Sequence, residues 1–273
     1  MTGVCLTGDI HSMQISYPEQ AFLQGDISEL KLGQKYNSIA ERYGIDVTLF
    51  VSGLAAKSQP ETLRQIAARP QTEIGGHTYR SLRPKLLHTA FRRFTGSLYG
   101  PTQYQRYDIK RTKRAIESIL SEDLSSWRTH AYASDEQTPQ ILVDCGFTTI
   151  SDDVVPASET HPKRQNGLLS IPVNTLRDHG HMYHAERTES AVAEAPHPGD
   201  EFCRDSFSPS EWGDRVIAQI REIVEEGGIA TIQAHPICQY IADEFDTLER
   251  LVRWLDEEDI STYTCREVAT LDN

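Results

Sequence analysis

The sequence contains no long apolar run and no recognisable leader segment. None of its stretches approaches the roughly 18 to 20 consecutive apolar residues that a membrane-spanning helix requires. After Met1 the chain passes almost directly into the apolar segment Val4–Leu6, without the basic segment and apolar core of a signal peptide. We therefore expect a soluble cytoplasmic protein with no membrane partner.

Cysteine pairs and an excess of basic residues are also missing. The five cysteines are widely spaced and include no CxxC pair, which is typical of a reducing compartment rather than of a disulfide framework. Lysine and arginine number 27 against 40 aspartates and glutamates, so the net charge is −13. Because phosphate backbones are bound by an excess of cationic side chains, this balance argues against a nucleic-acid partner. The oligomeric state stays open, and a homo-oligomer is compatible with the sequence.

The sequence does contain a regular alternation of helix-like and strand-like segments. Apolar residues spaced three and four apart predict helices, and short alternating or continuous apolar runs predict strands. This alternation implies a parallel sheet, and with so many units we expect it to close into a β/α barrel. The predicted strands are an opening strand before residue 7 and 47–51, 72–75, 126–128, 147–151, 168–173, 229–233 and 260–264; the predicted helices include 32–43, 60–68, 109–119, 136–145, 212–224 and 248–255.

The length of the chain favours one domain over residues 1–273, because single β/α barrels commonly reach this size. The stretch around 174–209 is polar and shows no clean period. Long loops in compact domains are often functional, so we interpret this stretch as an excursion from the barrel rather than as a second domain.

Polar residues follow the predicted strands, at the end where β/α barrels gather their chemistry. Asp9 and His11 come after the opening strand and, two residues apart, point the same way in an extended chain. Such a pair can share a metal ion, or the carboxylate can act as a base beside one. The alternative is a turn in which Asp9 caps the next helix.

Three later segments carry one candidate each. His77 follows two glycines that let the backbone bend and aim a ligand into a pocket, although isolated histidines are more often structural. Arg128 ends a strand and could orient a carboxylate, or pair with an acidic residue of the following turn. His235 ends a buried strand before Pro236, where it could donate a proton or be a core histidine bound to a backbone carbonyl.

Taken together, these segments resemble the NodB-type polysaccharide deacetylase family, also called carbohydrate esterase family 4. The order and spacing agree from Thr7 to Val268, and the most specific match is Glu73–Tyr79, which is similar to the family's EIGNHTY motif. Further similar segments are Arg128 with Thr138, Leu142 and Gly146-Phe147, then Ile232–Pro236 and Thr264–Val268.

The resemblance implies a distorted, incomplete TIM-type β/α barrel that forms one deacetylase-like catalytic domain. By position, Asp9 would be the general base, with Arg128 holding it, and His77 would be a metal ligand. His235 would be the general acid. The cofactor would be a divalent metal, with zinc preferred and cobalt, manganese or nickel as alternatives.

Two departures from the family pattern affect the metal ligands. The family's second metal-binding histidine falls on Ser81, a poor ligand. In the first motif the usual second aspartate falls on Ile10 in one alignment, whereas in a second alignment His11 replaces it, which keeps a ligand on the face of Asp9. Asp152 or Asp153, after the strand 147–151, could help position the same network.

A third metal ligand therefore remains open beside His11 and His77. One candidate is Asp9 itself. The others lie in the histidine-rich stretch 178–184, where His181 and His184 have suitable spacing if that stretch is helical. The alternative for this stretch is a solvated loop.

The resulting hypothesis is a metal-dependent hydrolase of linear amide bonds, whose substrate is an N-acylated sugar or a related N-acyl compound. Asp9 would activate water and His235 would protonate the leaving amine. Backbone N–H groups at Ala131 and Tyr132 would bind the oxyanion. Two alternatives are an allantoinase-like hydrolase of a small cyclic amide and a non-catalytic protein that binds a sugar or a partner through a degenerate site.

Overall fold

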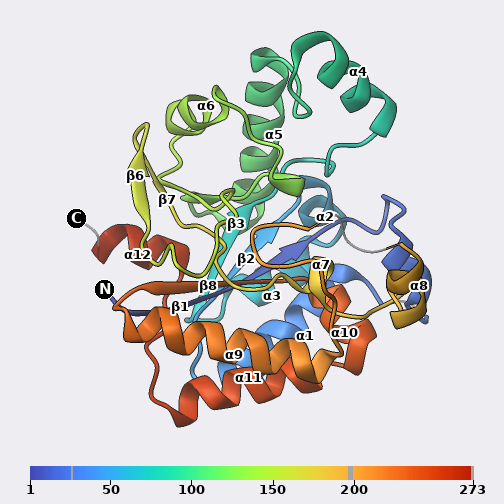
Figure 1. Cartoon of the computed structure of the whole chain (residues 1–273). Coiled ribbons are helices and arrows are strands. Elements are labelled where there is room, and N and C mark those ends of the chain that lie inside the picture. The colour runs from blue at the N-terminus through green and yellow to red at the C-terminus, as the bar shows by residue number, and fades with distance from the viewer. Residues whose placement is uncertain (26, 196–198, 272–273) are drawn as a thin grey trace.

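The computed structural model describes residues 1–25, 27–195 and 199–271, and it places one sheet between two groups of helices (Figure 1). The strand order is β6-β7-β5-β4-β3-β2-β1-β8. Neighbouring strands are parallel, except β6 and β7, which are antiparallel. The strands are β1 (Gly3–Ile10), β2 (Val47–Val51), β3 (Thr72–Gly76), β4 (Ser126–Trp127), β5 (Thr149–Ile150), β6 (Lys163–Gln165), β7 (Leu168–Ser170) and β8 (Ile229–Ala234).

Helices occupy most of the connections between these strands. In the described residues they are η1 (Pro18–Phe22), α1 (Glu29–Arg42), α2 (Gly53–Ser58), α3 (Pro60–Ala67), α4 (Lys85–Thr95), α5 (Thr102–Leu120), η2 (His130–Tyr132), α6 (Thr138–Asp144), α7 (Asp178–His181), α8 (Glu189–Glu194), α9 (Pro209–Glu225), α10 (Pro236–Asp243), α11 (Asp246–Glu257) and α12 (Cys265–Leu271). None of them is long and apolar enough to cross a membrane.

The sheet curls into a half-barrel, which confirms the expected distorted and incomplete barrel (Figure 1). Its two edge strands, β6 and β8, do not pair with each other in the described residues. Instead Asn174, which follows β7 and is fully buried, reaches β8 with its side chain. Its Nδ2 donates to the Ile229 carbonyl at 2.9 Å, and its Oδ1 accepts from the Thr231 N–H at 2.8 Å. A single amide thus replaces two ladder bonds where strand pairing stops.

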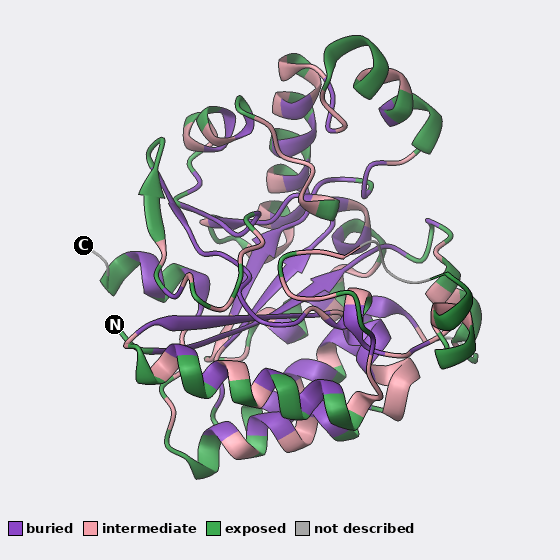
Figure 2. Ribbon diagram, viewed as in Figure 1, coloured by how far each residue is buried: buried purple, intermediate pink, exposed green. Residues whose placement is uncertain are grey.

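The core explains why these segments form these elements. All residues of β1, β2 and β8 are buried, as expected of central parallel strands covered on both faces. The helix α1 begins at Ser28, whose hydroxyl accepts the Lys31 N–H, and its buried side chains include Leu32, Tyr36 and Ile39. In Figure 2 the helices α1, α9 and α11 turn buried stripes towards the sheet and exposed stripes outward. This is the amphipathic spacing that the sequence predicted.

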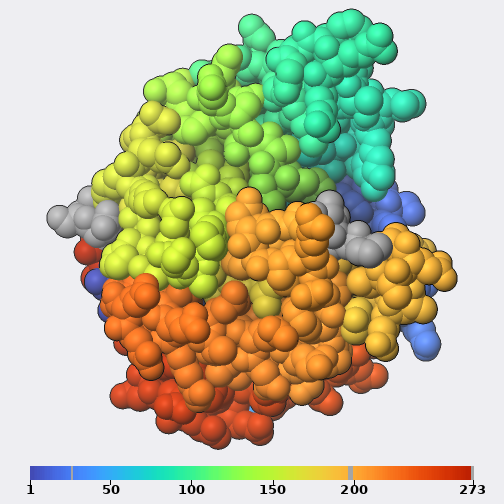
Figure 3. Space-filling model, in the orientation of Figure 1, coloured from blue at the N-terminus to red at the C-terminus, as the bar shows by residue number. Residues whose placement is uncertain are grey.

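The antiparallel strand β6 and the helix α4 were not predicted, and two predicted segments differ from the expectation. The predicted strand 260–264 is wrong, because this segment touches β1 only at a Val4–Thr262 bridge, after which α12 begins. The polar stretch around 174–209 contains the two short helices α7 and α8, and a Met182–Phe207 bridge folds it back on itself. Its residues 196–198 lie outside the described residues. Figure 3 shows the region of α4 as a projection at the top, opposite α9 and α11.

Candidate active site

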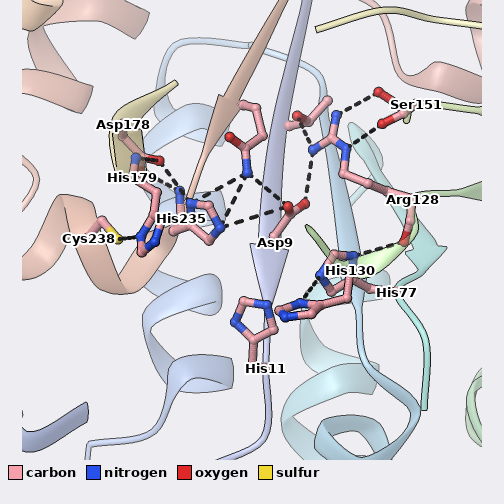
Figure 4. A network of polar contacts seen from close by, with 12 residues as sticks. Asp9, His11, His77, Arg128, His130, Ser151, Asp178, His179, His235 and Cys238 are labelled. Atoms are coloured by element: carbon pink, nitrogen blue, oxygen red, sulfur yellow. Dashed lines mark hydrogen bonds and ion pairs between the residues drawn. The ribbon is translucent and has the colours of Figure 1, made fainter. Parts of the chain in front are cut away.

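Parallel strands deliver the candidate residues to one edge of the sheet. His11, His77, Arg128 and His235 are each the first residue after a strand, following β1, β3, β4 and β8 in turn. Asp9 is the penultimate residue of β1. Because these strands are parallel, their ends lie on the same side, and the five side chains line or border one pocket of about 660 Å³. Figure 4 shows four of these side chains converging around Asp9.

The two glycines before His77 serve close packing rather than a bend. Both belong to β3 and have ordinary extended conformations. A Cβ on Gly75 would lie 2.6 Å from the Phe50 ring, and a Cβ on Gly76 would lie 2.6 Å from the Trp127 ring. The glycines therefore let aromatic side chains cover the strand, and the strand itself aims His77.

Asp9 is buried and bound at both carboxylate oxygens. Arg128 Nη1 donates to Oδ1 at 2.9 Å, and Gln233 Nε2 donates to Oδ2 at 2.9 Å. His235 Nε2 lies 3.9 Å from Oδ2. Burial alone would raise the pKa of Asp9, but the cationic Arg128, followed by His77 and His235, lowers it below its usual range. Asp9 is therefore a carboxylate at neutral pH.

Arg128 is held by more than its ion pair. Its fully buried guanidinium donates to Thr7 Oγ1 at 2.9 Å and to the Ser151 carbonyl and hydroxyl at 3.0 and 2.7 Å. It also stacks 4.4 Å from the Phe50 ring. Four hydrogen-bond acceptors and the Phe50 ring hold the guanidinium of Arg128 in one orientation. The Asp9 oxygen that binds Arg128 is therefore held in place as well.

Three histidines form a cluster beside Asp9. Ligand atoms of His11, His77 and His130 all lie within 4.8 Å of one another. His77 Nε2 lies 3.3 Å from His130 Nδ1, and the rings of His11 and His77 are 5.2 Å apart. His130 belongs to η2, three residues after β4 ends, and the sequence analysis did not consider it as a ligand.

Hydrogen bonds to the other ring atoms aim this cluster at a common point. His77 Nδ1 donates to the Arg128 carbonyl at 2.9 Å, which leaves Nε2 as a lone-pair donor. His11 Nδ1 lies 3.1 Å from Glu29 Oε2, while His11 Nε2 is buried without a hydrogen-bond partner in the described residues. A buried unpartnered nitrogen and a carboxylate behind the ring are the arrangement of metal-binding histidines. The three side chains therefore fit a divalent metal ion.

The protonation of this cluster agrees with that fit. Burial lowers the pKa of His77 to about 3, although Asp9 opposes the shift. The pKa of His130 lies well below its usual value because of burial and the neighbouring His11 and His77. Both rings are therefore neutral at neutral pH, which is the form that binds a metal.

His235 stands on the other side of Asp9 and is held by Asp178. Its Nδ1 lies 2.8 Å from Asp178 Oδ1, and its backbone N–H donates to Oδ2 at 2.6 Å. Burial would lower the pKa of His235, but Asp178 outweighs it and raises the pKa to about 9. Asp178 begins α7, and the sequence did not predict that it binds His235. An acidic residue a few positions after the strand-like run 168–173 was the available signal.

The other predicted candidates do not join the site in the same way. Asp152 is buried and its Oδ1 accepts the Thr129 N–H at 2.6 Å, which supports the turn before His130. Asp153 is exposed and accepts from Gln165 at 3.2 Å and from Ser170, so it lies outside the pocket. Ser81 is buried and lines the pocket, and its hydroxyl has no hydrogen-bond partner in the described residues.

The two candidates from the histidine-rich stretch lie away from His11 and His77. His181 uses Nε2 against Asp200 and Nδ1 against the Asp205 carbonyl, both at 2.8 Å. His184 Nδ1 donates to the Met182 carbonyl at 2.9 Å, and the potential metal ligands near His184 are His179 and Cys238. Neither belongs to the cluster of His11.

The turn 130–132 has the conformation expected of a strained loop beside a site. Ala131 and Tyr132 have φ angles of 55° and 52°, in the left-handed region that non-glycine residues rarely adopt. The Tyr132 N–H donates to the Thr129 carbonyl at 2.9 Å, so it is engaged within the turn. Of the two backbone N–H groups predicted to bind the oxyanion, the N–H of Ala131 is therefore the remaining candidate.

Comparison with known proteins agrees with the fold, which is a NodB-like half-barrel. Residues 32–150 match the family model described as polysaccharide deacetylase. That stretch of the chain is therefore similar to the polysaccharide deacetylases. No curated protein matches the sequence.

Solved structures share the fold over nearly the whole chain. A protein from Mycobacterium smegmatis that is assigned to the polysaccharide deacetylases has a TM-score of 0.72 at 18% identity, covering 99% of this chain and 90% of that one. Puue allantoinase has a TM-score of 0.64 at 14% identity, and the match covers 98% of this chain and 90% of that one. A CE4 family pseudoenzyme from Bacillus anthracis has a TM-score of 0.56 at 14% identity, and the match covers 98% of this chain and 65% of that one.

Proposed function

We propose that this chain is a metal-dependent amidohydrolase that removes the acyl group from an N-acylated sugar or a related amide. The observation that carries the proposal is a convergence in one pocket. His11, His77 and His130, whose ligand atoms lie within 4.8 Å of one another, are on one side of Asp9, and a histidine bound to Asp178 lies on the other. Hydrolysis of an amide needs these two functions, a base beside a metal ion and an acid for the leaving amine.

His11, His77 and His130 would hold the metal ion. When bound, a divalent ion supplies a Lewis acid that polarises the amide carbonyl and lowers the pKa of water. Zinc suits three imidazole ligands, and cobalt, manganese and nickel remain alternatives. Glu29 accepts the hydrogen bond from His11 and so orients the ring from behind.

Asp9 would accept the proton of the attacking water. Arg128 and Gln233 keep the carboxylate ionised and fix its direction, since each binds one of its oxygens. The tetrahedral oxyanion would receive a hydrogen bond from the backbone N–H of Ala131. His235, protonated because of Asp178, would donate its Nε2 proton to the departing nitrogen.

The test is an assay for acid release with the purified full chain and a divalent metal. We expect acetate release from N-acetylated oligosaccharides, and Asp9→Asn should lower kcat about 10²- to 10⁴-fold by removing the base. Asp153→Asn, which changes an exposed carboxylate outside the pocket, is the matched control and should keep wild-type activity. Thermal melts of both variants would show that each is folded.

The same assay separates the two alternatives. Turnover of small cyclic amides without turnover of N-acetyl sugars would replace the proposed substrate by the allantoinase-like one. A chain that binds no metal and releases no acid from either class would contradict the hydrolase proposal and favour a non-catalytic binding protein.

A further inference from the structure

A second group of metal-ligating side chains lies on the far side of His235. His179 follows Asp178 in α7, Cys238 lies in the first turn of α10, and His184 lies in the loop after α7. Ligand atoms of these three residues all lie within 4.8 Å of one another. The ring centroids of His179 and His235 are 5.4 Å apart, so the two side chains are in contact. This group therefore borders His235, the proposed acid (Figure 4).

The individual atoms are arranged as a ligand set. Cys238 Sγ lies 3.9 Å from His179 Nδ1, close to the separation of about 3.5 Å between sulfur and nitrogen ligands of a tetrahedral zinc ion. His184 Nδ1 donates to the Met182 carbonyl at 2.9 Å, which fixes its tautomer with Nε2 as the lone-pair donor. Glu19 Oε1 lies 3.7 Å from His179 Nδ1 and could supply a fourth ligand.

Charges of both signs border this group, since the carboxylates of Asp178, Glu19 and Glu29 lie near Cys238 and the protonated His235 lies beside His179. Cys238 is buried, and burial together with Asp178, Glu19 and Glu29 raises the pKa of its thiol. A metal ion would reverse the balance, and Cys238 would release its proton to solvent when it binds as a thiolate.

An overlapping group, formed by Asp178, His235 and Cys238, is a weaker candidate. Both oxygens of Asp178 are already occupied, because Oδ1 accepts from the His179 N–H and His235 Nδ1. Its Oδ2 accepts from the His235 N–H and from Gln239 Nε2 at 3.1 Å. These four hydrogen bonds use the lone pairs of the Asp178 carboxylate, so it is a poorer ligand than the two histidine rings.

We propose that His179, His184 and Cys238 form a second divalent-metal site, specific for a thiophilic ion such as zinc and separate from the site of His11, His77 and His130. Two imidazoles and a thiolate are soft ligands that select zinc over magnesium or calcium. The pocket reaches this group, since His179 and Cys238 are among its lining residues. The inference does not depend on the hydrolase activity.

The experiment is a Co²⁺ titration of the metal-stripped full chain, with stoichiometry read by mass spectrometry of the metal. We expect two equivalents in the wild type and a thiolate-to-cobalt charge-transfer band in the ultraviolet. Cys238→Ser should bind one equivalent and lose the band. His77→Ala should also bind one equivalent but keep the band, because it removes only the other site.

Two further variants keep the result unambiguous. Cys145→Ser removes a partly exposed thiol outside both clusters and should keep two equivalents and the band. His179→Ala changes an exposed side chain, so it tests the same site if the buried Cys238 variant does not fold, and should weaken the second equivalent at least tenfold. One equivalent without a charge-transfer band in the wild type, or a band that survives in both Cys238→Ser and His179→Ala, would overturn the proposal.

Discussion

Histidines flank Asp9 on two sides, and their environments give His77 and His130 a protonation state opposite to that of His235. On one side His77 and His130 are buried among other imidazoles and have lowered pKa values, so they are neutral. On the other side His235 is bound to Asp178, and its pKa is raised to about 9. Neutral rings bind metal ions, and a protonated ring can donate to a leaving group.

Between His77 and His235 the difference lies in the partner of Nδ1. For His77 that partner is the carbonyl of Arg128, a neutral acceptor that fixes the tautomer without compensating the burial of charge. For His235 it is a carboxylate, which stabilises the imidazolium. One residue type thus serves both halves of the proposed chemistry, and variants on each side should have different effects.

The largest effect is expected on the neutral side. His77→Ala should remove the metal ion from the first site and bring acid release below detection, because the Lewis acid is lost with its ligand. Metal content and activity of the same preparation provide the measurement. His161→Ala, which changes an exposed histidine, is the control; full activity of His77→Ala would refute its role as a ligand.

On the cationic side we expect a loss of turnover without a loss of metal. His235→Ala should lower kcat about 10²- to 10⁴-fold, the usual contribution of a positioned acid, while the first site keeps its metal ion. Asp178→Asn should lower kcat by less, because the ring stays in place but loses its charge.

Asp200→Asn is a matched control for Asp178→Asn. Asp200 also binds a histidine, since it lies 2.8 Å from His181 Nε2, but that pair lies outside the proposed chemistry. The Asp200→Asn variant should change the stability of the fold and leave kcat within a few-fold of wild type. Equal losses in both variants would show that the Asp178 pair is structural.

A smaller effect on the neutral side should come from Glu29, which supports His11 from behind. Glu29→Gln keeps the shape but weakens the hydrogen bond to Nδ1, so metal affinity should fall about 10- to 100-fold. Competition with a chelator of known affinity would measure the change, and Glu61→Gln on the exposed face of α3 is the control. An unchanged affinity would remove Glu29 from the metal site.

The smallest expected effect is on the pH dependence of stability in the metal-stripped protein. The raised pKa of His235 stabilises the fold below about pH 6.5, its unfolded value, and this contribution disappears as the pH rises through about 9. The lowered pKa of Asp9 acts in the opposite sense, since it stabilises above about pH 3.8 and is lost as the pH falls below.

Melting temperatures from pH 3 to 10 would test both limbs. His235→Gln should flatten the alkaline limb and Asp9→Asn the acidic limb, each by a few degrees, as about 1 kcal/mol shifts Tm by roughly 2–4 °C in a chain of this size. A variant that flattens both limbs would mean that the two groups do not act separately.

Local pattern was sufficient for most of the fold and failed where pairing depended on distant segments. The helix at 32–43 and the strand at 47–51 were predicted correctly because their apolar spacing shows which face is buried. The segment 260–264 has a strand-like composition, but only one residue pairs with β1 before α12 begins. The hydrogen bonds from the Asn174 side chain to β8 could not be predicted either, since a single asparagine carries no periodic signal.

The candidate site shows the same limit. Asp9, His11, His77, Arg128 and His235 were found because each lies at or directly after the end of a strand. His130 and Asp178 were missed because they lie a few residues further on, in a left-handed turn and at the start of a short helix. Their positions depend on how the chain turns after leaving the strand, which spacing alone does not give.

By itself, the sequence determined most of the parallel strands, and with them which side chains arrive at the carboxyl edge of the sheet, because the alternation of side chains follows from local chemistry. Only the tertiary structure decided that His130 joins His11 and His77 and that Asp178 binds His235. Those choices depend on contacts between segments 50 to 60 residues apart, and such contacts set the charge of each imidazole.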